Sequence, residues 1–256
     1  MARIRGTSGL GIVLLACALP FCACSSNSLE PEEANTLGSD PNEARPVPIP
    51  SDEEIVFYSD RDGDVEIYTM RSDGSAVTQL TFNDAIDIDP TWSPDGSKIA
   101  FMSTRDGGEW EIYVMDADGS NQTRLTNNWF LDSRPAWSPD GTRIAFSGER
   151  PTTIPDFPDL LWNWDLYVIQ ADGSGETRLT TDSGVDAGPS WSDAGILFES
   201  NRTGAYQIYA MQPDGSGLRA IPQPNGINIH PVWHYDGEQI VFVSGRLGND
   251  DLYVTR

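Results

Sequence analysis

Two histidines and a large excess of carboxylates are the side chains of this chain with the clearest capacity for chemistry. Both histidines, His230 and His234, lie in the segment NIHPVWHYDG. A zinc site of the His-x-x-x-His kind needs helical spacing and a third ligand, whereas the residues around this pair predict a strand. His234 is expected at a surface turn. His230 precedes the strand and is the better candidate for contact with a ligand.

The sequence motifs of common hydrolases and phosphate-binding enzymes are missing. Gly-x-Ser-x-Gly, a Gly-rich phosphate loop and His-Glu-x-x-His do not occur. The segment DRDGDVE from Asp60 is similar in composition to a calcium loop, but it lacks the twelve-residue spacing and the closing glutamate. We expect a hairpin turn there. The sequence therefore predicts no catalytic residue, no metal site and no cofactor.

One polar set recurs at fixed distances from a repeated proline. A carboxylate or amide stands three residues before the proline of four Pro-x-Trp segments, and an arginine recurs after the strand that follows. This set comprises Asp87, Asp132, Asp186, Asn228, Arg61, Arg105, Arg202 and Arg246. Because the set returns with each repeat, we expect a structural clamp between neighbouring units, made by carboxylate with guanidinium or backbone groups. The alternative is a ring of carboxylates that lines a channel and binds a cation.

Aromatic residues gather in one inserted segment, SGERPTTIPDFPDLLWNWD, and in two short segments before it. Surface loops rarely hold so many apolar side chains without a role. We expect the aromatic residues to form a partner- or ligand-binding surface beside the mouth of a channel. That predicted surface comprises Trp110, Trp129, Phe130, Phe157, Trp162, Trp164 and His230. The alternative is that the insertion folds back on the edge of its own unit.

An internal repeat must position all of these residues. Apolar triplets return at intervals of roughly 45 residues, the size of one propeller blade. They begin at Ile55, Ile99, Ile144, Ile196 and Ile240. Each period holds short apolar runs separated by turns rich in Gly, Asp and Pro, which is typical of strands and hairpins. Helical spacing of apolar residues does not persist.

The recurring phrase S-x-R-x-G … I-Y-x-M … D-G-S … R-L-T … P-x-W-S-P-D-G resembles the TolB-like, WD-like propeller repeat of bacterial envelope proteins. The resemblance runs from about Pro46 to the C-terminus. It implies an all-β propeller of four-stranded blades. The family includes scaffolds, binding modules and the non-catalytic propellers of peptidases. We therefore expect a protein-binding or scaffolding module of the cell envelope rather than an enzyme. The alternative is a carbohydrate- or peptide-processing enzyme that uses the channel.

The repeat count predicts five blades closed by an N-terminal strand. The last unit ends one strand short, and a segment around Ala34–Leu37 is expected to pair with Leu252–Thr255 as its outer strand. Pro46 stands in the frame of the repeated prolines, so RPVPIPSDEE is expected to hold the inner strand of the first blade. The alternative is an open arc that a second copy completes.

The N-terminus has the features of an export signal. Arg3 and Arg5 precede an apolar stretch that ends before Cys24. The stretch resembles the signal of bacterial lipoproteins, which implies a signal peptide at residues 1–23 and lipid on Cys24. Cys17 is the alternative lipid site, and an ordinary cleaved signal is a further one. Residues 24–32 are expected to be a tether and residues 33–256 the propeller, on the periplasmic side as an outer-membrane lipoprotein.

The charge of the chain restricts its partners. Its 39 acidic and 16 basic residues give a net charge of −23. Nucleic acid and an anionic membrane surface would both repel the domain. We expect membrane attachment through a lipid anchor alone, an envelope protein or glycan as the partner, and a monomer.

Overall fold

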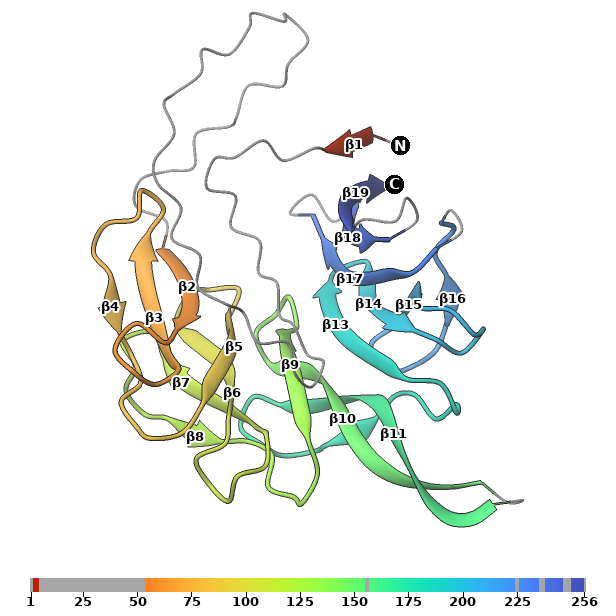
Figure 1. Cartoon of the computed structure of the whole chain (residues 1–256), viewed down its shortest axis with the longest axis horizontal. Coiled ribbons are helices and arrows are strands. Elements are labelled where there is room, and N and C mark those ends of the chain that lie inside the picture. The colour runs from red at the N-terminus through yellow and green to blue at the C-terminus, as the bar shows by residue number, and fades with distance from the viewer. Residues whose placement is uncertain are drawn as a thin grey trace, which may run out of the picture.

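The computed structural model describes residues 54–154, 157–223, 226–234, 238–245 and 250–255, together with a strand at residues 2–4. Side chains are described in these ranges except at residues 2–4 and 152–161. The described residues form strands and turns, arranged as five antiparallel sheets around a central axis (Figure 1). No helix among them is long and apolar enough to cross a membrane. The architecture is the predicted five-bladed β-propeller.

The first three blades follow one another along the chain, with the strands of each numbered from the centre outwards. The first comprises β2 (Glu54–Ser59), β3 (Glu66–Arg71) and β4 (Thr78–Gln79). The second comprises β5 (Asp87–Trp92), β6 (Lys98–Ser103), β7 (Glu111–Asp116) and β8 (Thr123–Arg124). The third comprises β9 (Asp132–Trp137), β10 (Arg143–Ile154), β11 (Phe157–Gln170) and β12 (Thr177–Arg178). The inner strand predicted for the first blade lies outside the described residues.

The last two blades complete the five. The fourth comprises β13 (Asp186–Ser192), β14 (Gly195–Ser200), β15 (Gln207–Met211) and β16 (Arg219–Ala220). The fifth comprises β17 (Asn228–Trp233), β18 (Ile240–Ser244), β19 (Asp251–Thr255) and β1 (Ala2–Ile4). Inner, second and third strands within each complete blade are joined in the same antiparallel order, so equivalent residues occupy equivalent places around the axis.

An N-terminal strand completes the fifth blade, but it is not the strand that the sequence predicted. The partner of β19 is β1, with Arg3 opposite Tyr253, whereas the predicted segment at Ala34–Leu37 lies outside the described residues. The pairing at this edge uses backbone N–H and C=O groups, which any short extended segment can offer. Side-chain pattern alone therefore does not select which N-terminal segment pairs there.

The core lies between neighbouring blades, which explains why the triplets are apolar at successive positions. Ile144 and Phe146 pack in a cluster with residues of the second blade, and Ala145 packs in a cluster with the fourth. Alternate residues of a strand point to opposite faces, so a blade covered on both faces needs apolar residues at every position. The phenylalanine of each triplet also lies beside the tyrosine of the next strand, as Phe146 does beside Tyr167, with ring centroids 5.6 Å apart.

Short turns between the inner and second strands are held by aspartates. Asp95 accepts hydrogen bonds from the Ser93 hydroxyl at 2.7 Å and from the Ser97 amide at 3.0 Å. Asp140 does the same with Ser138 and Thr142. These hydrogen bonds favour the charged form and lower the pKa of Asp95 and of Asp140 to about 2. The Ser-Pro-Asp-Gly motif therefore fixes the turn that leads into the second strand.

Candidate functional site

Buried ion pairs join the start of the inner strand to the end of the second strand in three blades. Arg105 contacts Asp87 at 2.6 Å, and Arg150 contacts Asp132 at 2.6 Å. In the fourth blade Arg202 contacts Asp186 at 2.8 Å. The antiparallel register causes this arrangement, because it places the first residue of an inner strand opposite the last residue of the second strand. The clamp thus joins two strands of one blade, not two blades as the sequence suggested.

Asparagines in the linkers carry the polar connection from one blade to the next. Asn128 donates to Asp132 at 2.7 Å through its side chain and to Glu111 of the preceding blade at 2.9 Å through its backbone. Asn83 makes the same pair of contacts, to Asp87 and to Glu66. These two linkers are therefore tied to both blades that they join.

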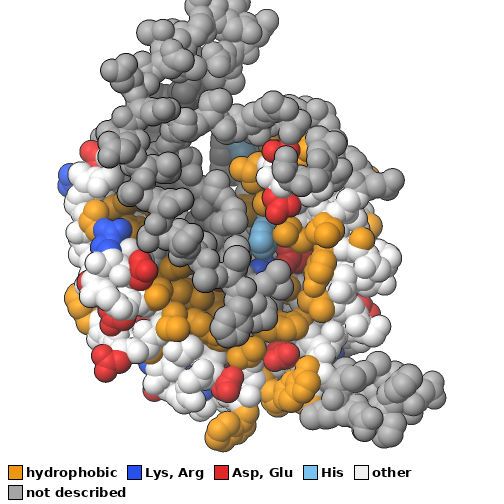
Figure 2. Space-filling model, in the orientation of Figure 1, with side chains coloured by type: hydrophobic (Ala, Val, Ile, Leu, Met, Phe, Trp, Pro, Cys, Tyr) orange, Lys and Arg blue, Asp and Glu red, His pale blue; other side chains and the backbone are white. Residues whose placement is uncertain are grey.

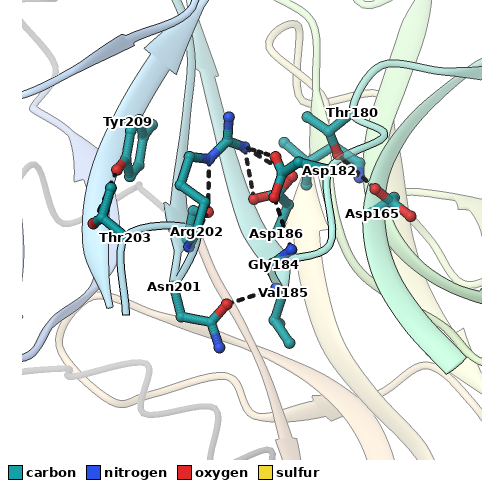
Figure 3. A network of polar contacts seen from close by, with 12 residues as sticks. Asp165, Thr180, Asp182, Gly184, Val185, Asp186, Asn201, Arg202, Thr203 and Tyr209 are labelled. Carbon is teal, nitrogen blue, oxygen red and sulfur yellow. Dashed lines mark hydrogen bonds and ion pairs between the residues drawn. The ribbon is translucent and has the colours of Figure 1, made fainter. Parts of the chain in front are cut away.

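The fourth blade extends this network through charges (Figure 3). Arg202 bridges Asp182 in the linker and Asp186 on β13, both at 2.8 Å. Asp165 accepts from the Thr180 hydroxyl at 3.2 Å, and burial raises the pKa of the Asp165 carboxyl to about 6. Burial also raises the pKa of Asp186. These carboxylates are held by partners inside the fold, so the set acts as architecture.

One arginine of these pairs was not predicted, and other members of the predicted set make different contacts. Arg150 was missed because it lies three residues after Ser147, whereas Arg105 lies two residues after Ser103. Arg61 lies over the Tyr68 ring, with 4.8 Å between the guanidinium carbon and the ring centroid. The remaining two members belong to the fifth blade. Asn228 bonds Gln207 at 3.0 Å, and Arg246 lies outside the described residues.

A second set of residues lies on the inner strands, each two residues after the carboxylate or amide of the first set. The residue directly before the repeated proline has a positive φ in four blades: Asp89 at 52°, Arg134 at 53°, Gly188 at 62° and His230 at 51°. The inner strands contact one another around the axis, so these four residues form one level of the channel wall. A positive φ is unfavourable for residues other than glycine. The backbone holds three polar side chains at this level despite that cost.

Three blades are connected across this level by hydrogen bonds. Arg134 pairs with Glu199 at 2.8 Å, and Glu199 accepts from the His230 amide at 2.6 Å. The guanidinium passes so close to Gly188 that a Cβ there would lie 2.9 Å from its nitrogen. Burial lowers the pKa of His230, against the opposing charge of Glu199. The imidazole of His230 is therefore favoured in its neutral form.

Sequence reasoning found only His230 of this second set. Asp89 and Arg134 were missed because they do not recur: the residue before the repeated proline differs from blade to blade. The usable signal was the variation itself: Asp, Arg, Gly and His stand before the same proline in successive repeats. A variable position inside a strict repeat is a candidate for function, since the fold does not require any one residue there.

A funnel opens where the inner strands end. It is a cavity of about 870 Å³ lined by the four repeated tryptophans, which are Trp92, Trp137, Trp191 and Trp233, together with the repeated prolines. Trp137 donates to the Thr91 carbonyl of the preceding blade at 3.2 Å, and Trp233 donates to the Gly195 carbonyl at 3.0 Å. On the face shown in Figure 2, hydrophobic side chains gather around the centre of the ring. Trp137 and Trp233 thus link adjacent blades, and the four tryptophans together form an apolar wall.

The structure brings only part of the predicted aromatic set together. The long hairpin of β10 and β11 extends beyond the ring (Figure 1). Trp162 on this hairpin contacts Phe130 edge-on, with ring centroids 5.7 Å apart, and Arg150 lies over Phe130. Trp162 is 54% exposed, and Trp129, the neighbour of Phe130 in the chain, is 90% exposed. We name Trp129, Phe130 and Trp162 the aromatic surface.

The remaining members of the predicted aromatic set lie elsewhere or are only partly described. Trp110 packs against the core between the second and third blades. Trp164 is partly buried on β11. The side chain of Phe157 lies outside the described residues, and His230 belongs to the channel wall. In the part of the chain with described side chains, no group of three histidine, cysteine or carboxylate residues is placed to hold a metal ion.

Five sheets around a central axis, three of them with an Asp–Arg pair between the inner and second strands, define a five-bladed propeller. The family model described as "TolB beta propeller domain" matches residues 40–110, 90–154 and 162–256. The chain therefore belongs to the TolB β-propeller family.

Individual relatives agree with this assignment. The chain is 34% identical over 156 residues to a "Protein TolB homolog" of Chlorobium luteolum, covering 60% of this chain and 33% of the relative. It is 43% identical over 54 residues to the "Tol-Pal system protein TolB" of Desulfosudis oleivorans, covering 21% and 12%. The structure of a putative TolB from Agrobacterium tumefaciens superposes with a TM-score of 0.60 at 28% identity, covering 75% of this chain and 69% of that one. The chain spans a third or less of the length of these two curated relatives.

Proposed function

We propose that this protein is an exported, lipid-anchored propeller that binds another protein of the cell envelope through the aromatic surface. The observation that carries the proposal is the exposure of two neighbouring tryptophan-bearing segments, with Trp129 at 90% and Trp162 at 54%. Large aromatic side chains are enriched among the residues that dominate binding energy in protein interfaces. Leaving them in water is unfavourable, and a partner that covers them removes this penalty.

The position of the aromatic surface supports a binding role. Phe130 belongs to a linker in which Asn128 donates hydrogen bonds to Glu111 of the preceding blade and to Asp132 of the following blade. Trp162 lies on β11, a strand that continues into the core. Arg150, itself paired to Asp132, lies over the Phe130 ring at 5.4 Å. These contacts hold the aromatic rings before a partner arrives, which lowers the entropy lost on binding.

The envelope location of the partner is supported by the relatives and by the N-terminal sequence. One relative is named a Tol-Pal system protein, which supports a protein partner rather than a nucleic acid. Residues 1–23 have the pattern of an export signal with Cys24 behind it. We assign the protein to the periplasmic side of the envelope, attached to the membrane by lipid on Cys24. Cleavage before Cys24 would remove β1, so the fifth blade of the processed protein would have to be completed by another segment. We propose a binding role, not a catalytic one.

The experiment that tests this proposal is capture of a partner from envelope extract by the purified protein. Trp129→Ala combined with Trp162→Ala should lose the captured band, while the melting temperature stays within about 2 °C, because exposed side chains contribute little to folding. Phe82→Ala is the matched control, since Phe82 is a 74% exposed aromatic residue in the equivalent linker of the preceding blade. Equal capture by the double variant and by wild type would exclude the aromatic surface as the binding site.

A further inference from the structure

The outer part of the long hairpin is a ribbon of only two strands. β9 pairs with β10 as far as the pair of Asp132 with Gly148, and β12 pairs with β11 at Tyr167 and Val168. Beyond these residues β10 and β11 pair with each other alone, and the hairpin extends beyond the ring (Figure 1). Each strand of this extension therefore has an outer edge that no other strand in the described part of the chain covers.

The outer edge of β10 is blocked by a proline. In a strand, the backbone groups of alternate residues point to the same side. The Glu149 amide donates to the Leu131 carbonyl at 2.8 Å, on the side of β9, so Pro151 presents its nitrogen to that side as well. Proline has no N–H to donate, and proline at an exposed edge prevents a further strand from pairing there.

The outer edge of β11 is open. On the side of β12, the Leu166 carbonyl accepts from the Leu179 amide at 2.7 Å, and the Leu166 amide donates to the Thr180 hydroxyl at 3.0 Å. The register with β10 is continuous here, so Trp164 and Trp162 present their N–H and C=O groups to the same side. Within the described residues, these groups make no hydrogen bond on that side.

An extended segment of another protein matches this open edge. Such a segment bonds the free N–H and C=O groups and adds a third strand to the hairpin. Trp162, which is 54% exposed and contacts Phe130, lies on this edge. An added strand would therefore run past its side chain and join the aromatic surface.

The charge of the hairpin favours a basic segment. Residues 151–163 hold two aspartates and no lysine or arginine, and the whole chain has a net charge of −23. Arg150, the cation nearest to this stretch in sequence, is already paired with Asp132 at 2.6 Å and with Glu176 at 3.3 Å. A segment that carries lysine or arginine complements this charge, whereas an acidic segment would be repelled.

We propose that an extended, basic segment of a partner protein pairs with the open edge of β11 at Trp162 and Trp164 and adds a strand to the hairpin. This strand pairing rests on the proposed binding role, because it describes how the same partner is held. A partner held by the side chains of the aromatic surface alone is the competing outcome, and it would refute the strand pairing while the proposed function stands.

The test is hydrogen exchange of single amides, measured by mass spectrometry in the free protein and in its complex with the protein captured from envelope extract. Amides without an acceptor exchange faster than hydrogen-bonded amides. The Trp162 and Trp164 amides should exchange about tenfold or more slowly in the complex than in the free protein. The Glu149 amide, already bonded to Leu131, is the matched control and should exchange at one rate in both. Equal rates for Trp162 in the two states would overturn the strand pairing.

Substitution at Leu160 tests the same edge through affinity. Leu160 precedes Leu161, which pairs with Thr152, so its N–H also points to the open edge. Leu160→Pro removes side chain and N–H, whereas Leu160→Ala removes the side chain alone. Titration with the captured protein should show binding about fivefold weaker for proline than for alanine. Pro151→Thr restores a donor on the opposite edge and should leave binding unchanged. Binding by wild type should weaken as ionic strength rises.

The outcomes separate the two proposals. If the double variant Trp129→Ala with Trp162→Ala still captures the partner, or if wild type captures none, the proposed function fails and the strand pairing fails with it. If that variant loses capture but Leu160→Pro binds as Leu160→Ala does, the strand pairing alone is refuted. Binding that does not depend on ionic strength refutes the basic segment. If Leu160→Pro lowers the melting temperature, the exchange experiment decides, because it uses the wild-type protein.

Discussion

The buried pair between Asp132 and Arg150 allows a quantitative test of the clamp. Asp132 is fully buried and Arg150 is 13% exposed on its side chain, with 2.6 Å between the charged atoms. Replacing Asp132 by alanine leaves the guanidinium with little solvent and only its longer contact to Glu176 at 3.3 Å, and it removes the hydrogen bond from Asn128. Breaking one partner of a buried pair typically destabilises by about 3–5 kcal/mol. We expect a loss in that range.

The assay is urea unfolding followed by tryptophan fluorescence, with Lys98→Ala as the control. Lys98 and Asp116 lie 2.7 Å apart, nearly the same separation, but their side chains are 46% and 34% exposed. An exposed pair contributes about 0–1 kcal/mol. The two substitutions therefore remove ion pairs of similar length and differ in burial. Asp132→Ala should lower the midpoint strongly, and Lys98→Ala should hardly move it.

The double variant Asp132→Ala with Arg150→Ala completes the cycle. If the buried charge left behind causes the loss, the double variant should be more stable than the sum of the two single losses predicts. Equal losses for Asp132→Ala and Lys98→Ala would refute the reasoning, because burial would then make no difference to the strength of the clamp.

Three further predictions follow from single residues. Trp137→Ala should cost about 3–5 kcal/mol, because Trp137 is 6% exposed and donates to the preceding blade; a loss below about 1 kcal/mol in urea unfolding would contradict this. The folded-state pKa of Asp95 and of Asp140 is lowered to about 2, so their contribution is present above the unfolded pKa of about 4 and is lost as pH falls towards 2. Melting curves at pH 5 and pH 2.5 of wild type and Asp95→Asn should therefore converge at the lower pH. Cys24→Ser should release the protein into the soluble fraction after cell fractionation, and unchanged membrane association would exclude Cys24 as the lipid site.

The repeat carried most of the predictable information about the fold. Apolar residues at successive positions, as in Ile144–Phe146, indicate a strand covered on both faces, and stacked blades supply that environment. The recurring aspartates and arginines could be found because the register between the inner and second strands repeats from blade to blade and places the two residue types side by side. Arg150 was missed where an insertion moved the arginine by one position.

Sequence alone determined the repeating unit and the number of units, because both follow from a pattern that recurs along the chain. Only the tertiary structure decided which side chains meet around the central axis. Arg134 meets Glu199 across 65 residues of sequence, and the partner of β19 comes from the other end of the chain. Such contacts depend on how the ring is completed, and no local pattern encodes them.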